Sequence, residues 1–436
     1  MARKGDELKI GVISLGCSKN LVDTEILLGK LKSAGAKLVD DPKKANTIII
    51  NTCGFINPAK EEAIDYILEY AENKRVIVMG CLVERYKEEL QKEIPEVQAY
   101  FGTESWDQIL EFLGLKRVEK VQRLLTTPKS YAYLKISEGC NRLCSFCAIP
   151  SIRGKYRSKS IQELIEEARW IAENGVKELC LISQDTTYYG RDLYGKNALL
   201  KLLEKLEGIE DIEWVRLLYL YPTDVSDGLI DYIKNSSKVL PYFDIPLQHV
   251  SNRVLKSMRR GYGKDFVEGL VERIFSKIPN AVLRTSFIVG YPEEDTKDFE
   301  ELLEFVQKSY FHWVGVFSYS HEDGTFAESL GDPIPEEEKE RRKALIYEVQ
   351  SEVIKEKYRG LLGKSFRMLV DGYDEEMNIV PVGRLWFQAP EVDGLCYLEA
   401  ERVVKEGEMV DVVVKDFKGL DLLVEEKSER RKEDKA

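Results

Sequence analysis

Short apolar runs alternate with amphipathic stretches over the first quarter of the chain. The runs KIGVISLG, NTIIINTCG and KRVIVMGCL have the length and composition of buried strands, and the stretches between them predict helices from about Asp23 and about Pro58. Continuous apolar runs separated by helices are typical of a parallel sheet that is covered on both faces. The pattern therefore predicts a parallel α/β domain over residues 8–122.

A second region follows the predicted linker VQRLLTTPKS at residues 121–130 and extends over residues 131–360. Helical patterns such as IQELIEEARWIAENG separate six further apolar runs, which are YAYLKIS, ELCLISQ, EWVRLLY, PYFDIPL, VLRTSFIVG and WVGVFSYS. Six βα units in about 230 residues favour an open (βα)6 partial TIM barrel over a full eight-stranded barrel. A doubly wound sheet remains the alternative.

The last region, residues 362–428, changes to five β-rich stretches separated by turn signals about every ten residues. This spacing predicts a small antiparallel β-barrel. The whole chain is thus predicted to be an α/β protein with a β-barrel at its C-terminal end.

Composition and charge narrow the class of protein. With 436 residues, 44% hydrophobic and 32% charged, the chain has an ordinary globular composition, and it has no run of ~18 apolar residues that would span a membrane. The first residues, MARKGDELKI, show no signal peptide, so we expect a cytoplasmic protein with reduced cysteines and no membrane partner. A net charge of -12 argues against binding a polyanion over a broad surface.

The string SEGCNRLCSFCAIPSIRG places Cys140, Cys144 and Cys147 in a Cys-x3-Cys-x2-Cys array just after a predicted strand. Three thiolates can hold three irons of a 4Fe-4S cluster and leave the fourth iron without a protein ligand. Zinc is the alternative, but structural zinc takes four ligands, and the next candidates in the chain are the distant Cys180 and His249.

A second trio of cysteines follows the three N-terminal apolar runs, at Cys17, Cys53 and Cys81. The carboxyl ends of parallel strands meet at one edge of a sheet, so these cysteines are expected to converge and to hold a second cluster. Single cysteines after strands are often only small buried side chains, and this alternative stays open for each one. Cys180 and Cys396 lie inside strand patterns and are assigned to packing.

The Cys140–Cys147 array resembles the radical S-adenosylmethionine (SAM) superfamily, in which the open iron binds SAM and the cluster cleaves it to a radical. Phe146 matches the aromatic residue that packs near the adenine in that superfamily. In its order of parts the chain resembles, over residues 8–426, the methylthiotransferases, which have a three-cysteine domain, a radical barrel and a TRAM β-barrel. The resemblance implies two 4Fe-4S clusters, SAM as radical source and methyl donor, and an external electron donor.

The same resemblance implies further cofactor-binding residues at the ends of barrel strands. Polar side chains at these ends are site candidates, although many such side chains only cap helices or satisfy loop backbone. The candidates are Ser183, Gln184, Asp185, Arg216 and Gln248. Beside the cysteine loop, Arg153 and Lys155 are candidates for contact with a carboxylate or a phosphate.

Three local strings resemble the branch of the family that modifies the β-carbon of an aspartate in ribosomal protein S twelve, rather than the branch that modifies tRNA adenosines. SLGCSKNLVDTE differs from the tRNA-type GCQMN, EGCNRLCSFCAIPSIRGKYRS is similar to the protein-modifying branch, and PLQHVSNRVLKSMRRG carries Gln248-His249 instead of Gln-Ser. The implied partner is that ribosomal protein or the small subunit. A tRNA enzyme and a cluster-bearing scaffold protein without chemistry remain the alternatives.

The charge of the C-terminal region distinguishes a tRNA substrate from a protein substrate independently of the resemblance. Residues 362–426 carry 7 Lys plus Arg against 15 Asp plus Glu, a balance of -8. An RNA-binding barrel is expected to have a basic face, whereas an acidic barrel suits a basic ribosomal protein. We therefore expect that the protein does not bind tRNA, unless the acidity serves only solubility. Separately, we expect a monomer.

Overall fold

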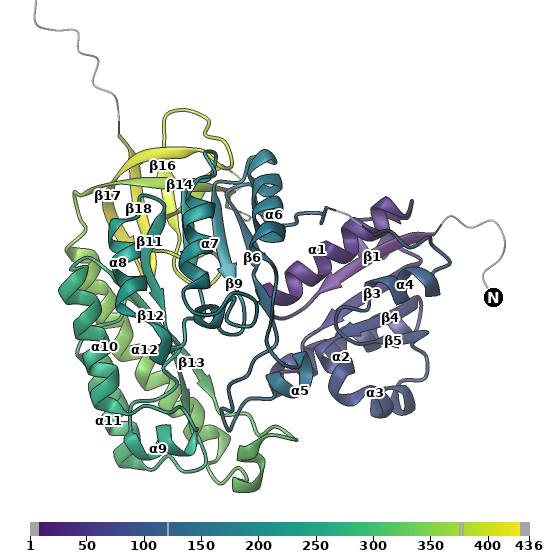
Figure 1. Cartoon of the computed structure of the whole chain (residues 1–436), viewed down its shortest axis with the longest axis horizontal. Helices are drawn as coiled ribbons and strands as arrows, with labels where there is room; N and C mark the ends of the chain where they lie inside the picture. The colour runs from purple at the N-terminus through teal and green to yellow at the C-terminus, as the bar shows by residue number, and fades with distance from the viewer. Residues whose placement is uncertain (1–7, 120–121, 375, 377–378, 428–436) are drawn as a thin grey trace, which may run out of the picture.

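The computed structural model of the chain describes residues 8–119, 122–374, 376 and 379–427. These residues form two parallel sheets and a closed β-barrel, in the order predicted along the chain (Figure 1). Residues 121 and 428, which bound the predicted linker and the predicted β-barrel region, lie outside the described residues. No helix in the described ranges combines the length and apolarity needed to cross a lipid bilayer.

The N-terminal sheet confirms the three predicted strands and adds two short edge strands. Its order is β2-β1-β3-β4-β5, and all its pairings are parallel. The strands are β1 (Lys9–Ser14), β2 (Lys37–Leu38), β3 (Thr47–Thr52), β4 (Arg75–Gly80) and β5 (Ala99–Phe101). The helices are α1 (Ser18–Ser33), α2 (Asn57–Ala71), α3 (Cys81–Glu93) and α4 (Trp106–Phe112).

Helix α1 begins at Ser18, earlier than the start at about Asp23 that the apolar pattern predicts. Its first two turns bury polar side chains, among them Lys19, Asn20 and Asp23, against the rest of the protein. A helix that buries polar groups has no apolar period to read, so the pattern placed its start too late.

The central sheet has the six predicted strands in the order β13-β12-β11-β10-β9-β6, again all parallel. A doubly wound sheet would reverse its strand order at a switch point, and this order does not reverse. The open (βα)6 barrel is therefore confirmed and the doubly wound alternative is wrong. The strands are β6 (Tyr131–Lys135), β9 (Glu178–Ile182), β10 (Trp214–Leu217), β11 (Val239–Asp244), β12 (Val282–Val289) and β13 (Trp313–Ser318).

Helices cover the outer face of this sheet. The longer ones are α6 (Ile161–Glu173), α7 (Ala198–Glu207), α8 (Asp227–Asn235), α10 (Lys264–Lys277), α11 (Thr296–Gln307) and α12 (Glu336–Arg359). Two short helices, α5 (Ile149–Arg153) and α9 (Asn252–Ser257), and the paired β7 (Ser137–Glu138) and β8 (Arg157–Ser158) complete the region. Alternate strand residues such as Leu134, Leu181 and Leu217 pack under the helices.

The C-terminal barrel contains the five predicted strands, but it is not wholly antiparallel. It closes in the order β14-β15-β16-β18-β17, and β16 pairs with β18 in parallel. Strand directions cannot alternate around a closed ring of five, so at least one pairing must be parallel. The strands are β14 (Ser365–Tyr373), β15 (Pro381–Leu385), β16 (Cys396–Glu399), β17 (Met409–Lys418) and β18 (Asp421–Glu426).

The C-terminal barrel packs against the inner face of the (βα)6 barrel. Its loop after β15 makes the contacts: Phe387 O accepts from Trp313 Nε1 at 2.8 Å, and Asp393 accepts from the Tyr242 hydroxyl at 2.6 Å. Glu391 accepts from the Tyr131 hydroxyl at 2.7 Å. The two barrels therefore share one core, and the C-terminal barrel closes part of the open barrel's interior.

Candidate functional site

The cysteines of both trios line one cavity of about 650 Å³. The cavity is lined by the strand ends of the N-terminal sheet, by the carboxyl ends of the (βα)6 strands and, at one side, by Pro390, Glu391 and Val392 of the C-terminal barrel. Cavities at the carboxyl ends of parallel strands are the usual place for active sites in such folds. The six cysteines are Cys17, Cys53, Cys81, Cys140, Cys144 and Cys147.

The N-terminal trio comes from three neighbouring strands. Cys17 precedes α1 after β1, Cys53 follows β3 directly, and Cys81 is the first residue of α3 after β4. In the order β2-β1-β3-β4-β5 the chain turns back between β1 and β3, and this switch point is where open α/β sheets bind ligands. The sheet topology therefore brings the trio together, as the spacing of the three runs predicts.

The second trio lies on one loop between β7 and α5. Gly139 opens the loop at φ +74°, and a Cβ there would lie 2.3 Å from the Lys155 carbonyl oxygen, so only glycine fits. The Cys140 amide donates to Gly154 O at 3.1 Å, and the Cys147 amide donates to Cys144 O at 3.1 Å. Backbone hydrogen bonds thus hold the three thiols on one short turn.

All eight cysteines have free thiols in the structure. Burial raises the pKa of Cys81 and of Cys147 to about 12, and that of Cys140 to about 11. Metal binding needs thiolates, so loading these sites releases protons and is favoured by the positive charge of iron. Within the described ranges no three Cys, His, Asp or Glu side chains are arranged to hold a single metal ion. Each trio offers three thiols, which suits a cubane, whose irons each take one thiolate.

Arg153 connects the two trios. It ends α5, directly after the second trio, but its guanidinium reaches the first: Nη2 donates to Cys81 Sγ at 3.2 Å. Its Nη1 donates to Asp23 at 2.6 Å and to Glu138 at 3.1 Å. Lys135 completes this buried group of four charges by pairing with both carboxylates. Of the two basic candidates beside the loop, Arg153 therefore meets carboxylates, while Lys155 is exposed and does not line the cavity.

The charges in this group stabilise one another. Burial alone would raise the pKa of Glu138, but Lys135 and Arg153 outweigh burial and lower it to about 2. The Glu138 carboxylate therefore stays ionised, and the ion pairs keep the guanidinium beside Cys81 fixed at the interface between the N-terminal domain and the barrel.

The second trio has its own guanidinium. Arg260 Nη1 donates to Cys144 Sγ at 3.1 Å, while Nη2 donates to Pro246 O at 2.7 Å and Nε donates to the Tyr262 hydroxyl at 2.8 Å. Hydrogen bonds to cluster sulfurs are one of the means by which proteins set a cluster's reduction potential. In the described residues each trio thus has an arginine whose guanidinium donates to a cysteine sulfur.

The predicted cofactor residues separate into two groups. Phe146, Gln184 and Gln248 line the cavity, and Gln248 holds a left-handed backbone at φ 72°. Ser183 and Asp185 do not line it. Asp185 instead accepts from Arg142 Nε at 2.8 Å and so ties the cysteine loop to the end of β9, while Ser183 Oγ accepts from the Asp185 amide at 3.1 Å.

Arg216 is not at the cavity, and its predicted place there is corrected by the structure. It is fully buried between the two barrels, where Nε donates to Glu178 at 2.6 Å and Nη1 donates to Trp386 O at 2.9 Å. The side chain faces the interior of the open barrel, but this part of the interior is filled by the C-terminal barrel. His249, the family marker, is also buried, and its Nδ1 accepts from the Ser251 amide at 3.0 Å.

Sequence reasoning missed many cavity residues, among them Lys19, Arg142, Tyr219 and Arg260. Arg142 lies inside the cysteine array and Lys19 lies two residues after Cys17, so their closeness to cysteines in the chain was the available signal. Tyr219 and Arg260 are far from any trio in sequence, and only the fold brings them in.

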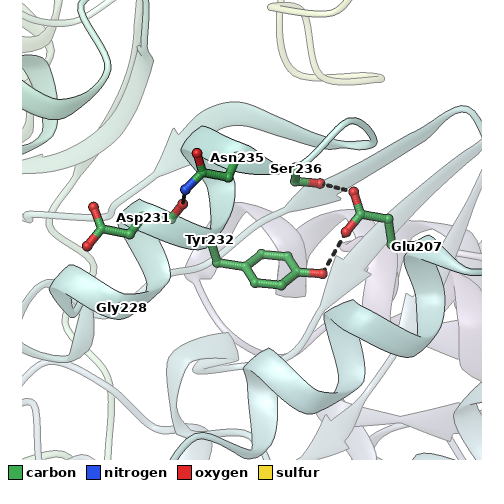
Figure 2. A pocket seen from close by; sticks show the side chains of 6 residues that line it. All are labelled: Glu207, Gly228, Asp231, Tyr232, Asn235 and Ser236. Atoms are coloured by element: carbon green, nitrogen blue, oxygen red, sulfur yellow. Dashed lines mark hydrogen bonds between the residues drawn. The ribbon is translucent and has the colours of Figure 1, made fainter.

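A second depression of about 330 Å³ lies on the outer side of the barrel between α7 and α8 (Figure 2). Glu207 of α7 there accepts from the Tyr232 hydroxyl at 2.7 Å and from the Ser236 hydroxyl at 2.5 Å (Figure 2). The depression contains no cysteine, and these polar groups hydrogen-bond to one another. It is therefore a structural contact between two helices and not part of the site.

Three family models match this chain in succession. The uncharacterized protein family UPF0004 matches residues 9–102, the radical SAM superfamily matches residues 134–306, and the TRAM domain matches residues 362–425. The three matches follow, in order, the N-terminal sheet, the central sheet and the C-terminal barrel.

Curated relatives match almost the whole chain. It is 61% identical to "Ribosomal protein uS12 methylthiotransferase RimO" of Aquifex aeolicus, over 95% of this chain and 96% of the relative. It is 48% identical to the protein of the same name from a Sulfurihydrogenibium species, over 94% of this chain and 96% of the relative.

Solved structures share the fold at low identity. TsrM of Kitasatospora setae, a radical SAM methyltransferase, has a TM-score of 0.52 at 11% identity, over 71% of this chain and 73% of its own. OxsB, a cobalamin-dependent SAM radical enzyme, has a TM-score of 0.51 at 14% identity, over 81% of this chain and 61% of its own. At this identity the likeness concerns the fold alone.

Proposed function

The chain belongs to the RimO family of ribosomal protein uS12 methylthiotransferases, and from this membership we propose that it replaces a hydrogen on the β-carbon of a uS12 aspartate with a methylthio group. The observation that carries the proposal is that both cysteine trios line one cavity. A reaction that must both activate a carbon and deliver sulfur to it needs two reactive centres facing the same atom.

We assign a 4Fe-4S cluster to each trio. When bound, the cluster at Cys140, Cys144 and Cys147 supplies with SAM the radical that activates the carbon, while the cluster at the N-terminal trio supplies sulfur and a further SAM the methyl group. The backbone turn from Gly139 fixes the first three thiols, and the sheet fixes the other three. Phe146, Gln184 and Gln248 line the same cavity and are the residues we propose for SAM contact.

The cavity also needs to exclude water while a radical forms. The C-terminal barrel helps to do this, because Pro390, Glu391 and Val392 close one side. Glu391 is held there by hydrogen bonds from the Tyr131 and Tyr133 hydroxyls at 2.7 and 3.0 Å. The barrel therefore forms part of the site wall as well as part of the core.

A tRNA substrate is disfavoured by the names of the relatives and by the charge of residues 362–426. Two carboxylates of this region are not free, because Asp371 and Asp393 form buried pairs with Arg384 and Arg284. Exposed carboxylates remain, including Glu399, Glu401 and Asp411. These support the basic ribosomal protein as partner. A scaffold protein would not need six thiols around one cavity.

Other parts of the proposal follow from the substrate and the cofactors. A ribosomal protein as substrate and eight free thiols support a cytoplasmic location. Reduction of the clusters requires an external electron donor, and we expect the chain to act as a monomer.

The test is mass spectrometry of purified uS12 after incubation with the anaerobically reconstituted enzyme, SAM, a reductant and sulfide. We expect one sulfur and one methyl group to be added at one aspartate, and no methylthio group in tRNA treated in parallel. Modified tRNA adenosine with unmodified uS12 would contradict the assignment.

A further inference from the structure

Lys19 places an ammonium group in the cavity that both trios line. It is the second residue of α1, two positions after Cys17, and it is 7% exposed. Its Nζ lies 3.3 Å from the centre of the Tyr219 ring, which belongs to the loop after β10 in the (βα)6 barrel and also lines the cavity. The contact is a cation–π interaction that spans the two domains.

The neighbouring cations of the cavity have anionic or sulfur partners. Arg142 pairs with Asp185, Arg153 with Asp23, Arg284 with Asp244, and Arg260 donates to a cysteine sulfur. For Lys19, by contrast, no ion pair or hydrogen bond of the ammonium is found in the part of the chain that the structure describes. A buried charge without a counter-charge is costly, so such a group indicates a missing anion.

Tyr219 gives a second, independent indication. Its φ is 61°, in the left-handed region that bulky residues rarely adopt. Its amide donates to Asp244 Oδ2 at 2.9 Å, and its carbonyl accepts from the Thr186 amide at 3.0 Å, so the surrounding structure enforces this conformation. Enforced backbone strain of this kind gathers at ligand sites. The strained residue is the one whose ring supports the Lys19 ammonium.

We propose that Lys19 binds the side-chain carboxylate of the substrate aspartate, with Tyr219 as a positioning residue. The carboxylate of an aspartate is bonded directly to its β-carbon, so an ion pair to the carboxylate fixes the reacting carbon within the cavity. The inference rests on the proposed function and adds to it the group that selects aspartate over its neutral isostere asparagine.

The methionine carboxylate of SAM is the other anion with the same chemistry. Lys19 lies on the same helix start as Cys17 of the N-terminal trio, whereas Phe146 and the trio proposed to bind SAM belong to the (βα)6 barrel. This placement favours the substrate carboxylate, and the two sources give different experimental results.

The experiment measures binding of uS12, and of uS12 with its target aspartate changed to asparagine, to the reconstituted full-length enzyme with SAM present. The parent enzyme is expected to bind the asparagine form about tenfold or more weakly, as for loss of a buried charge-assisted pair. Lys19→Met should bind both forms equally, and Lys19→Arg should restore part of the preference. Lys155→Met, which removes an exposed lysine outside the cavity, should behave as the parent.

Two readouts distinguish this role from damage to the fold. Lys19→Met should hold as much iron as the parent and should not melt at a lower temperature, since it removes a buried charge without a partner. Its SAM concentration dependence for cleavage without substrate should also be unchanged.

If Lys19→Met still prefers the aspartate form, the inference is wrong. If it instead needs more SAM for cleavage and keeps the preference, the anion is the carboxylate of SAM and the inference is also overturned. If the parent binds neither form of uS12, the proposed function itself fails, and the inference falls with it.

Discussion

The two cysteine trios reach the same cavity by different structural routes. Cys140, Cys144 and Cys147 lie within eight residues of one loop, whereas Cys17, Cys53 and Cys81 come from three strands spread over 65 residues of chain. The loop trio is defined locally, by a glycine turn and backbone hydrogen bonds. The sheet trio exists only when the N-terminal domain is folded with β1, β3 and β4 side by side.

The two trios also differ in the domain that supplies the arginine bound to them. Arg260 and Cys144, which it contacts, both belong to the (βα)6 barrel, so the loop trio is supported from within one domain. Arg153 belongs to the barrel but donates to Cys81 of the other domain. The sheet trio therefore depends on the interface between the domains as well as on its own sheet.

The largest effects should come from removing each trio. Changing the loop trio to alanine should abolish cleavage of SAM to 5'-deoxyadenosine, because the proposed radical cluster is lost. Changing the sheet trio should leave this cleavage measurable and stop sulfur insertion. Both products are measured by chromatography with mass detection. Equal loss of cleavage in the two variants would remove the proposed division of roles.

Replacing Arg153 and Arg260 one at a time should show how much of the protein's stability depends on the interface between the domains and how much on contacts within the (βα)6 barrel. Arg153→Met leaves Asp23 and Glu138 with Lys135 as their one cation in the buried group, and such a change costs about 3–5 kcal/mol. Arg260→Met leaves no unpaired carboxylate among its hydrogen-bond partners and should cost less. Urea unfolding followed by a probe in each domain measures the difference. A greater loss in Arg260→Met would contradict the interdomain role of Arg153.

As the pH falls, the (βα)6 barrel should lose stability before the N-terminal domain does, because the N-terminal domain has no histidine. Burial, with a smaller effect of Lys357, lowers the pKa of His312 to about 3. The folded state keeps this histidine neutral while the unfolded state protonates below about pH 6.5, so its contribution to stability is complete above pH 6.5 and is lost as the pH falls toward 3. In this window the free energy of unfolding should fall by about 1.4 kcal/mol for each pH unit.

The matched variant is His312→Gln, for which denaturation of the barrel between pH 6.5 and 4.5 should depend less on pH. Melting curves at each pH give the comparison. An unchanged slope would show that His312 is protonated in the folded barrel, and the expected order of domain unfolding would then lose its basis.

The smallest effect is expected at the surface of the C-terminal barrel. Changing Glu399, Glu401 and Asp411 to lysine should weaken uS12 binding several-fold at low salt, with little effect at high salt, where surface charges are screened. SAM cleavage without substrate should not change, because these exposed residues do not line the cavity. Unchanged binding at low salt would mean that the acidity serves solubility.

The sequence allowed prediction of the main strands of the two parallel sheets and the C-terminal barrel and of where the six cysteines lie, because apolar runs and the residues that follow them carry both signals. It could not locate Arg216, since strand alternation shows that a side chain faces the barrel interior but not that another domain fills this place. The start of α1 was missed for a related reason, because Lys19 and Asp23 are buried polar residues that interrupt the apolar pattern. Contacts between domains, such as Arg153 with Cys81, have no local signal at all.

The charge argument shows the same limit. Summing residues 362–426 treats every carboxylate as free, yet Asp371 and Asp393 lie in buried ion pairs and Glu391 accepts from two tyrosine hydroxyls. The C-terminal barrel is also part of the core that closes the (βα)6 barrel, so deleting it would expose that core and would not test docking alone. Point changes on exposed carboxylates are therefore the sharper test.

Iron content tests most directly the claim that two separate clusters face one cavity. After anaerobic reconstitution the parent should hold about eight irons per chain, and each trio variant should hold about four, with the absorption and magnetic resonance signals of a 4Fe-4S cluster. About four irons in the parent, or a sheet-trio variant that keeps all eight, would contradict the two-cluster site.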